Sequence, residues 1–145
     1  MAGNLHVSLA CGAITRAAAE QALGVSLPVN NPGVPNDRDG CEYDSRTDTS
    51  QFVSVDRVGP ELRARSVADL AGQNQGGARM DGLPNGGVGY LTCSAGADRH
   101  SCQSDLLVGN EEFVVTAAGQ DLDSENLKKA VETLSSALCA SAARR

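Results

Sequence analysis

The five cysteines are the residues of this sequence with the clearest chemical options, and their spacing separates three uses. They are spread along the chain, at Cys11, Cys41, Cys93, Cys102 and Cys139. No two of them are separated by only two to four residues, and the two histidines are His6 and His100. A zinc site normally draws on at least one close pair of ligands, so no metal site is predicted. Two uses remain: incidental thiols in a reducing compartment, or disulfide bonds in an oxidising one.

Two disulfide pairings suit the sequence. Cys93 and Cys102 flank a loop-like run between two strand-like segments, where a bridge would close the base of a hairpin. Cys11 and Cys41 would tie the first helix to the first strand and close a loop of about 30 residues, worth about 3–4 kcal/mol in the chain-entropy description. Five cysteines allow other connectivities. We expect these two bridges with Cys139 as a free thiol, and hence an oxidising, extracytoplasmic compartment.

Catalytic arrangements find little support in the sequence. A Gly-x-Ser-x-Gly nucleophile motif is absent, and Asp98, His100 and Ser101 stand too close on one loop to converge as a triad. Acidic pairs stand in turns or at helix starts, where solvation and the helix dipole account for them: Asp37 with Asp39, Glu111 with Glu112, and Asp121 with Asp123. No catalytic residue is assigned, and a binding role is favoured over an enzymatic one.

Two glycine-containing segments share only part of a ligand-binding motif. Residues 82–89 (Gly-Leu-Pro-Asn-Gly-Gly-Val-Gly) precede a strand rather than a helix and contain no Lys-Ser/Thr pair, so they fit neither a phosphate loop nor a dinucleotide fingerprint. Residues 37–40 (Asp-Arg-Asp-Gly) resemble the start of a calcium loop but lack the downstream glutamate of an EF-hand. No cofactor is predicted.

The composition limits the fold and the class of partner. A chain of 145 residues has room for one domain, and 41% hydrophobic with 21% charged residues is typical of a folded protein. Aromatic residues make up only 3%, so the core must be built from aliphatic side chains. A net charge of −6 argues against nucleic acid and against anionic membrane surfaces as partners.

The sequence is expected to form a single domain over residues 11–145. Residues 1–10 are expected to be a disordered segment or a remnant of cloning, because they are too short and too polar for a signal peptide. Apolar stretches of transmembrane length are absent. An exported form would therefore be secreted, or anchored through a leader that this sequence does not contain.

Hydrophobic periodicity predicts three helices and five strands. The helices cover 16–23 between an N-cap at Thr15 and Gly24, 60–71 with an Arg65–Asp69 ion pair, and a final helix after an N-cap at Asp123. The final helix is expected to bury a stripe that consists of Leu127, Ala130, Val131, Leu134 and Leu138, with Cys139 half-buried on the flank of that stripe. The strands are 41–45, 51–58, 88–93, 102–108 and 112–118, with a tight hairpin at Gly109-Asn110.

The resulting order is helix, two strands, helix, three strands, helix. Strands joined by hairpins imply a mainly antiparallel sheet, and the helices would pack on it in an α+β fold stabilised by disulfides. Two segments read as flexible links, residues 28–40 and 73–87, and they could border one edge of this sheet. Met80 and Tyr90 lie nearby as apolar contacts, so they are the candidate ligand-contact residues.

Several short motifs occur together in a familiar order. Residues 11–15 (Cys-Gly-Ala-Ile-Thr) precede an Ala-rich helix that closes with Ala-Leu-Gly at 22–24, and residues 41–43 (Cys-Glu-Tyr) add a second cysteine with an aromatic two positions later. Gly-Leu at 82–83 and a strand, a Gly-Asn turn, a strand and a helix over 88–140 complete the pattern. In these features the chain resembles a family of small actinobacterial exported lipoproteins that is catalogued as a domain of unknown function.

The resemblance carries implications of its own. It implies a protein of the bacterial cell envelope, a bridge between Cys11 and Cys41, and a fold similar to the PsbP-like α/β/α sandwiches. It also implies a ligand-binding or adaptor role. The chain departs from the family pattern because the leader and lipobox are missing and Cys139 is additional. These departures leave membrane anchoring open.

Two functions are therefore carried forward. The first is an extracytoplasmic, non-enzymatic binding or adaptor domain, with a small hydrophobic ligand or an envelope protein as its partner. The second is a small enzyme or sequestering protein that acts on a hydrophobic metabolite through Tyr90 and acidic loop residues. An apolar cavity that contains a carboxylate with a raised pKa would favour the second.

Overall fold

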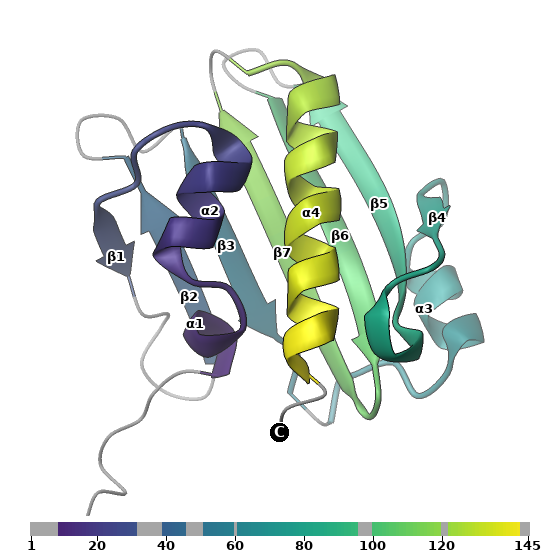
Figure 1. Ribbon diagram of the computed structural model, residues 1–145. Coiled ribbons are helices and arrows are strands. Elements are labelled where there is room, and N and C mark those ends of the chain that lie inside the picture. Colours follow the sequence, from purple (N-terminus) through teal and green to yellow (C-terminus); the bar gives the residue numbers. More distant parts are fainter. Residues whose placement is uncertain are drawn as a thin grey trace, which may run out of the picture.

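A seven-stranded antiparallel sheet forms the centre of the molecule (Figure 1). The computed structural model describes residues 9–31, 39–45, 51–59, 61–95, 100–119 and 122–142. The strand order is β1-β2-β3-β7-β6-β5-β4. The strands are β1 (Val29–Asn31), β2 (Asp39–Asp44), β3 (Phe52–Arg57), β4 (Ala78–Met80), β5 (Val88–Ala95), β6 (His100–Val108) and β7 (Glu111–Gly119).

The long C-terminal helix and the two N-terminal helices cover one face of this sheet, whereas the helix Val67–Gln73 packs on the opposite face (Figure 1). Helix α4 (Ser124–Ala142) lies along β6 and β7, and α2 (Arg16–Leu23) packs beside α4. The short α1 (Leu9–Ala13) contacts β2 and β3. Helix α3 (Val67–Gln73) lies near the β4 edge and contacts β5 and β6, and a 3-10 turn, η2 (Pro84–Gly86), contacts α4. The structure is thus of the mixed α+β class with a mainly antiparallel sheet, as predicted.

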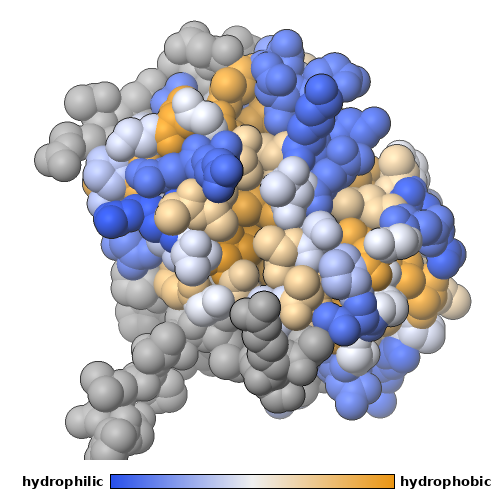
Figure 2. Space-filling model, viewed as in Figure 1, coloured by the Kyte–Doolittle hydropathy of each residue, from blue (hydrophilic) through white to orange (hydrophobic). Residues whose placement is uncertain are grey.

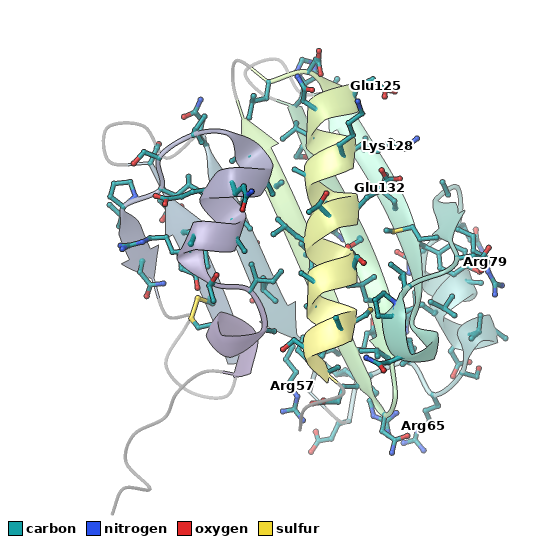
Figure 3. The ribbon with its side chains drawn as sticks, viewed as in Figure 1. Arg57, Arg65, Arg79, Glu125, Lys128 and Glu132 are labelled. Carbon is teal, nitrogen blue, oxygen red and sulfur yellow. A yellow bond between two sulfur atoms is a disulfide. The ribbon has the colours of Figure 1, made fainter. Side chains whose placement is uncertain are left out.

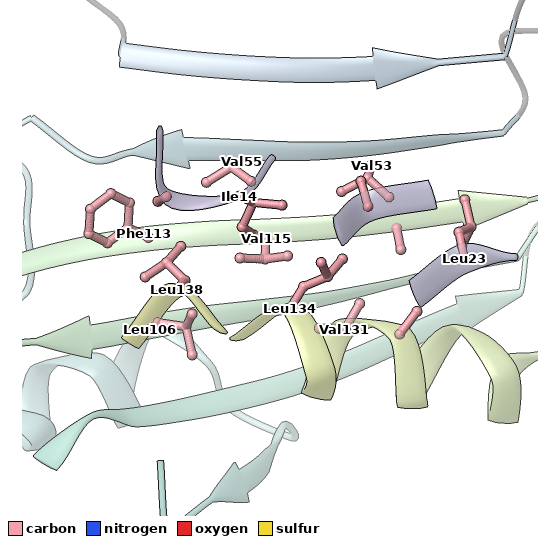
Figure 4. Close-up of a cluster of buried hydrophobic side chains, with 14 of the residues drawn as sticks. Ile14, Leu23, Val53, Val55, Leu106, Phe113, Val115, Val131, Leu134 and Leu138 are labelled. Carbon is pink, nitrogen blue, oxygen red and sulfur yellow. The ribbon is translucent and has the colours of Figure 1, made fainter. Parts of the chain in front are cut away.

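The hydrophobic core lies between the helices and the sheet (Figure 4). Alternate residues of β3 and β7 point into it, and Val53, Val55 and Val115 are fully buried there. The predicted stripe of α4 faces them, since all five of its residues are buried: Leu127, Ala130, Val131, Leu134 and Leu138. Cys139 is fully buried as well, which corrects the expectation of a half-buried flank position. The chain at Gly87 covers it so closely that a Cβ there would lie 2.6 Å from the Cys139 sulfur.

The predicted helix caps and the predicted hairpin turn are confirmed. The Thr15 side chain accepts a hydrogen bond from the Ala18 N–H, and Gly24 takes the left-handed conformation, with φ 76°, at the end of α2. The Asp123 carboxylate accepts from the Asn126 N–H at 2.9 Å ahead of α4. Val108 pairs with Glu111, so Gly109-Asn110 forms the predicted two-residue hairpin.

The helix predicted over residues 60–71 is wrong in its start. Helix α3 begins at Val67, because the Ser66 side chain caps it by accepting from the Asp69 N–H at 3.1 Å. The Asp69 carboxylate accepts from the backbone N–H of Arg65 instead of forming the predicted ion pair with its guanidinium. Pro60, the expected first residue, lies outside the described residues.

The predicted element order is incomplete because three short elements lack a readable periodicity. Strands β1 and β4 have three residues each, and α1 has five. The disordered segment expected over residues 1–10 lies mainly outside the described residues, but Leu9 and Ala10 belong to α1. Within the described part of the chain, every helix is too short or too polar to cross a bilayer.

Candidate functional site

Four of the five cysteines form disulfide bonds that join separate helices and strands. The structure contains both predicted disulfides: Cys11–Cys41 joins α1 to β2, and Cys93–Cys102 joins residues that are opposite each other in β5 and β6. Cys139 is the free thiol, and burial raises its pKa to about 11. It therefore stays protonated and unreactive at neutral pH. Among the described residues there is no cluster of three or more metal-ligating side chains.

His100 and Ser101, which the sequence analysis rejected as members of a catalytic triad, point away from each other in the structure. Ser101 Oγ lies 3.1 Å from Ser94 Oγ, whereas the His100 ring nitrogen Nδ1 lies 3.1 Å from the backbone oxygen of Leu122. The two residues are neighbours on β6, so their side chains point to opposite faces of the sheet. Asp98, the proposed third member, lies outside the described residues, as do Asp37 and Asp121. Of Asp39 only the backbone is described.

Glu111 and Glu112, adjacent in sequence, are separated by the pleat of β7. Glu111 Oε2 forms an ion pair with Arg57 Nε at 2.6 Å. Glu112 points to the opposite face and is only 3% exposed. Its acidic neighbour is Asp105 of β6, which is 7% exposed. Among the described residues, the acidic side chains that come together in the buried part of the sheet are therefore those of Asp105 and Glu112.

Sequence reasoning missed the Asp105–Glu112 pair. The available signal was an aspartate inside the otherwise apolar end of β6, next to Leu106 and Leu107. A charged residue in such a position is rarely buried unless it has a partner. The partner, however, comes from another strand, so the sequence could raise the question and could not answer it.

The environment of Glu112 perturbs its ionisation strongly. Burial raises its pKa to about 7, and a hydrogen bond to Asp105 and the charge of Asp105 act in the same direction. The Ala64 N–H, which donates to Glu112 Oε1 at 2.6 Å, and the nearby Arg63 oppose the shift. The Asn74 amide donates to Asp105 Oδ2 at 2.8 Å. The pair thus lies beneath the chain that runs into and through α3.

A surface groove with apolar lining lies between β4 and α4 and is called here the β4–α4 groove. Its volume is about 330 Å³. Apolar side chains of Met80, Leu83 and Leu91 lie at its base, and polar residues border it: Arg79, Asp81, Lys128 and Glu132. Figure 2 shows hydrophobic residues in this part of the surface beside hydrophilic ones, and Figure 3 shows Arg79 on one side with Lys128 and Glu132 on the other.

The structure separates the two predicted ligand-contact residues. Met80 lines the β4–α4 groove. Tyr90 is paired in register with Arg79, next to Met80 on β4, so its side chain lies on the opposite face of the sheet. The two predicted flexible segments do not border one edge either. Val29–Asn31 forms β1 and Ala78–Met80 forms β4, and these strands are the two opposite edges of the sheet.

A second groove runs between α2 and α4, with a volume of about 340 Å³. Small side chains dominate its walls, among them Ala18, Ala22 and Ala137, with Lys129 and Thr133 beside them. Neither groove contains Asp105 or Glu112. The only strongly perturbed carboxyl group in the described residues is therefore remote from both grooves.

The chain matches no model of a known protein family, and no curated protein matches it significantly. The resemblance to exported actinobacterial lipoproteins therefore stays a prediction.

Proposed function

We propose that this protein is an extracytoplasmic, non-enzymatic binding domain that takes a small amphipathic molecule in the β4–α4 groove. The observation that carries the proposal is the apolar base of that groove, formed by Met80, Leu83 and Leu91 inside a charged border. The two disulfides support an oxidising compartment. The cell-envelope location and the kinship with exported lipoproteins belong to the same proposal.

The size and charges of the groove restrict the ligand. A volume of about 330 Å³ lies at the lower end of the range for ligand sites, so a short acyl chain or a single ring would fill it. Arg79 Nε and Asp81 Oδ1 form an ion pair at 2.9 Å, whereas Lys128 and Glu132 stand one helical turn apart on α4. An apolar body with a charged or polar head matches this arrangement.

The walls of the groove are held in place before a ligand arrives. Strand β4 is paired with β5 through three residues, and Asn85 of η2 donates to the Cys139 backbone oxygen at 2.7 Å. That bond ties the chain after β4 to α4, which forms the opposite wall. A groove that is already formed loses less conformational entropy when it binds.

The position of Glu112 favours binding over catalysis. A small enzyme acting on a hydrophobic metabolite would need a carboxyl group of raised pKa inside its apolar cavity. Glu112 has the raised pKa, but it points to the face opposite α4, and both grooves lie beside α4.

The proposal is tested by titrating the disulfide-intact protein with the fluorescent anion anilinonaphthalene sulfonate and displacing it with decanoate. We expect saturable binding that Met80→Glu weakens at least tenfold, because a carboxylate would then lie among apolar groups. Thr133→Glu adds the same charge in the α2–α4 groove and should leave the affinity unchanged. The lack of saturable binding, or equal losses in the two variants, would refute the proposed site, provided that both variants keep the wild-type circular dichroism.

A further inference from the structure

The segment that covers Asp105 and Glu112, residues 61–74, is anchored sparsely by apolar contacts. We call it the α3 segment. Only two of its residues are buried, Ala64 at 1% and Leu70 at 0% exposure, while Leu62 is 79% exposed. Its remaining anchors are polar and end on the acidic pair. The Ala64 N–H donates to Glu112 Oε1 at 2.6 Å, and the Asn74 amide donates to Asp105 Oδ2 at 2.8 Å.

The oxygens of the pair indicate where a proton is needed. Asp105 Oδ1 is buried and has no hydrogen-bond donor within the described structure. Two ionised carboxylates are acceptors only, so they cannot bond to each other. A carboxyl group that keeps its proton becomes a donor and removes both difficulties. The hydrogen bond between Glu112 and Asp105 requires such a protonated form.

We propose that Asp105 and Glu112 hold one proton between them, that this proton fastens the α3 segment to the sheet, and that the segment opens when the proton leaves. With both groups ionised, two negative charges would be buried next to each other beneath the α3 segment, which only Ala64 and Leu70 hold by apolar contacts. Repulsion and desolvation then favour the open form, in which water reaches both carboxylates. This inference does not depend on the proposed ligand.

The surrounding charges are too few to remove this effect. Arg63, in the α3 segment, is the cation that acts on Glu112. Tyr90 of β5 is opposite Asp105, and it pairs in turn with Arg79 of β4. Asp56 of β3 is opposite Val114, two residues from Glu112, and adds negative charge to the same face.

The direction of the pH dependence follows from linkage. Glu112 has its pKa raised from 4.5 to about 7 in the closed form, so protonation favours closure. The stabilisation is complete below pH 4.5 and is lost as the pH rises through about 7. If the open form has the ordinary value of 4.5, the opening equilibrium constant rises by about 30-fold from pH 5.5 to pH 8.5.

The first test is a carboxyl carbon NMR titration of the intact chain from pH 3 to pH 9. We expect the Glu112 carboxyl to keep its proton until the pH approaches about 7. Ionisation of both groups below pH 5.5 would refute a shared proton.

The second test is hydrogen exchange of the wild type and of Glu112→Gln, compared at pH 5.5 and again at pH 8.5. The glutamine amide can donate to Asp105 while its oxygen accepts from the Ala64 N–H, so the variant should stay closed at both pH values. In peptides of the α3 segment, the ratio of the wild-type exchange rate to the variant exchange rate should rise about 30-fold from pH 5.5 to pH 8.5.

Two further variants keep the result decisive. Glu61→Gln removes the same charge from an exposed position of the α3 segment and should behave as the wild type. Asp105→Asn removes the other charge of the pair and should make the pH dependence smaller without abolishing it, because Glu112 stays buried. This variant also tests the proposal if Glu112→Gln does not fold. Equal ratios at the two pH values, or parallel loss of protection in α4, would overturn local release.

Discussion

The hydroxyl pair between Ser104 and Ser135 provides a directional test of how α4 is fixed to the sheet. Both residues are fully buried, Ser104 on β6 and Ser135 on α4, and their oxygens lie 2.7 Å apart. Ser135 Oγ also lies 2.6 Å from the Val131 backbone oxygen, which can only accept. The single proton of Ser135 therefore goes to Val131, and Ser104 must donate to Ser135.

This donor order makes the two alanine substitutions unequal. Ser135→Ala leaves the Ser104 hydroxyl buried without an acceptor, and an unsatisfied buried polar group costs about 1–3 kcal/mol. Ser104→Ala leaves Ser135 bonded to Val131 and removes one ordinary hydrogen bond, worth about 0.5–1.5 kcal/mol. The double variant removes both hydroxyls and should be no less stable than Ser135→Ala alone.

The assay is urea unfolding followed by circular dichroism, with both disulfides intact and the free energy extrapolated to water. Ser136→Ala, on the same helix and only half-buried, is the control and should change the stability by less than about 0.5 kcal/mol. A larger loss for Ser104→Ala than for Ser135→Ala would refute the donor order. Strictly additive losses in the double variant would refute the coupling between the two hydroxyls.

Two further predictions concern the cysteines. Iodoacetamide at pH 8 should modify no cysteine of the folded protein, because Cys139 is buried and its pKa is about 11. Mass spectrometry should show one modified thiol after unfolding in urea and five after reduction, and modification of the folded protein would contradict the burial. Replacing Cys11 and Cys41 by alanine should lower the unfolding free energy by about 4 kcal/mol, because this disulfide closes a loop with a sequence separation of 30 residues. Replacing Cys93 and Cys102 should lower it by only about 3 kcal/mol, because the separation there is 9 residues. Equal losses in urea unfolding would argue against the loop-entropy explanation.

Features that depend on a few neighbouring residues could be predicted from the sequence. The caps at Thr15 and Asp123 and the turn at Gly109 follow from the backbone and hydrogen-bonding preferences of single residues. The stripe of α4 follows from its helical period, and the alternation of β3 from its strand period. In each case the deciding interaction is local.

Features that depend on pairing between distant segments could not be predicted. The three-residue strands β1 and β4 exist because β2 and β5 supply their hydrogen bonds. Helix α3 starts late because Ser66 caps it, while Ala64 is held by Glu112. The sequence also could not show that Met80 and Tyr90 lie on opposite faces of the sheet, because the register between β4 and β5 decides this.

The sequence by itself determined the mixed α+β class and the apolar faces of the main helices and strands, because those properties reside in residue types and in their period along the chain. The tertiary structure decided the order of the strands, the groove between β4 and α4 and the meeting of Asp105 with Glu112. These depend on side chains brought together from different strands and helices. Burial then changes their chemistry, as it does for Glu112, whose ionisation is set by an aspartate on the next strand and a backbone N–H 48 residues away.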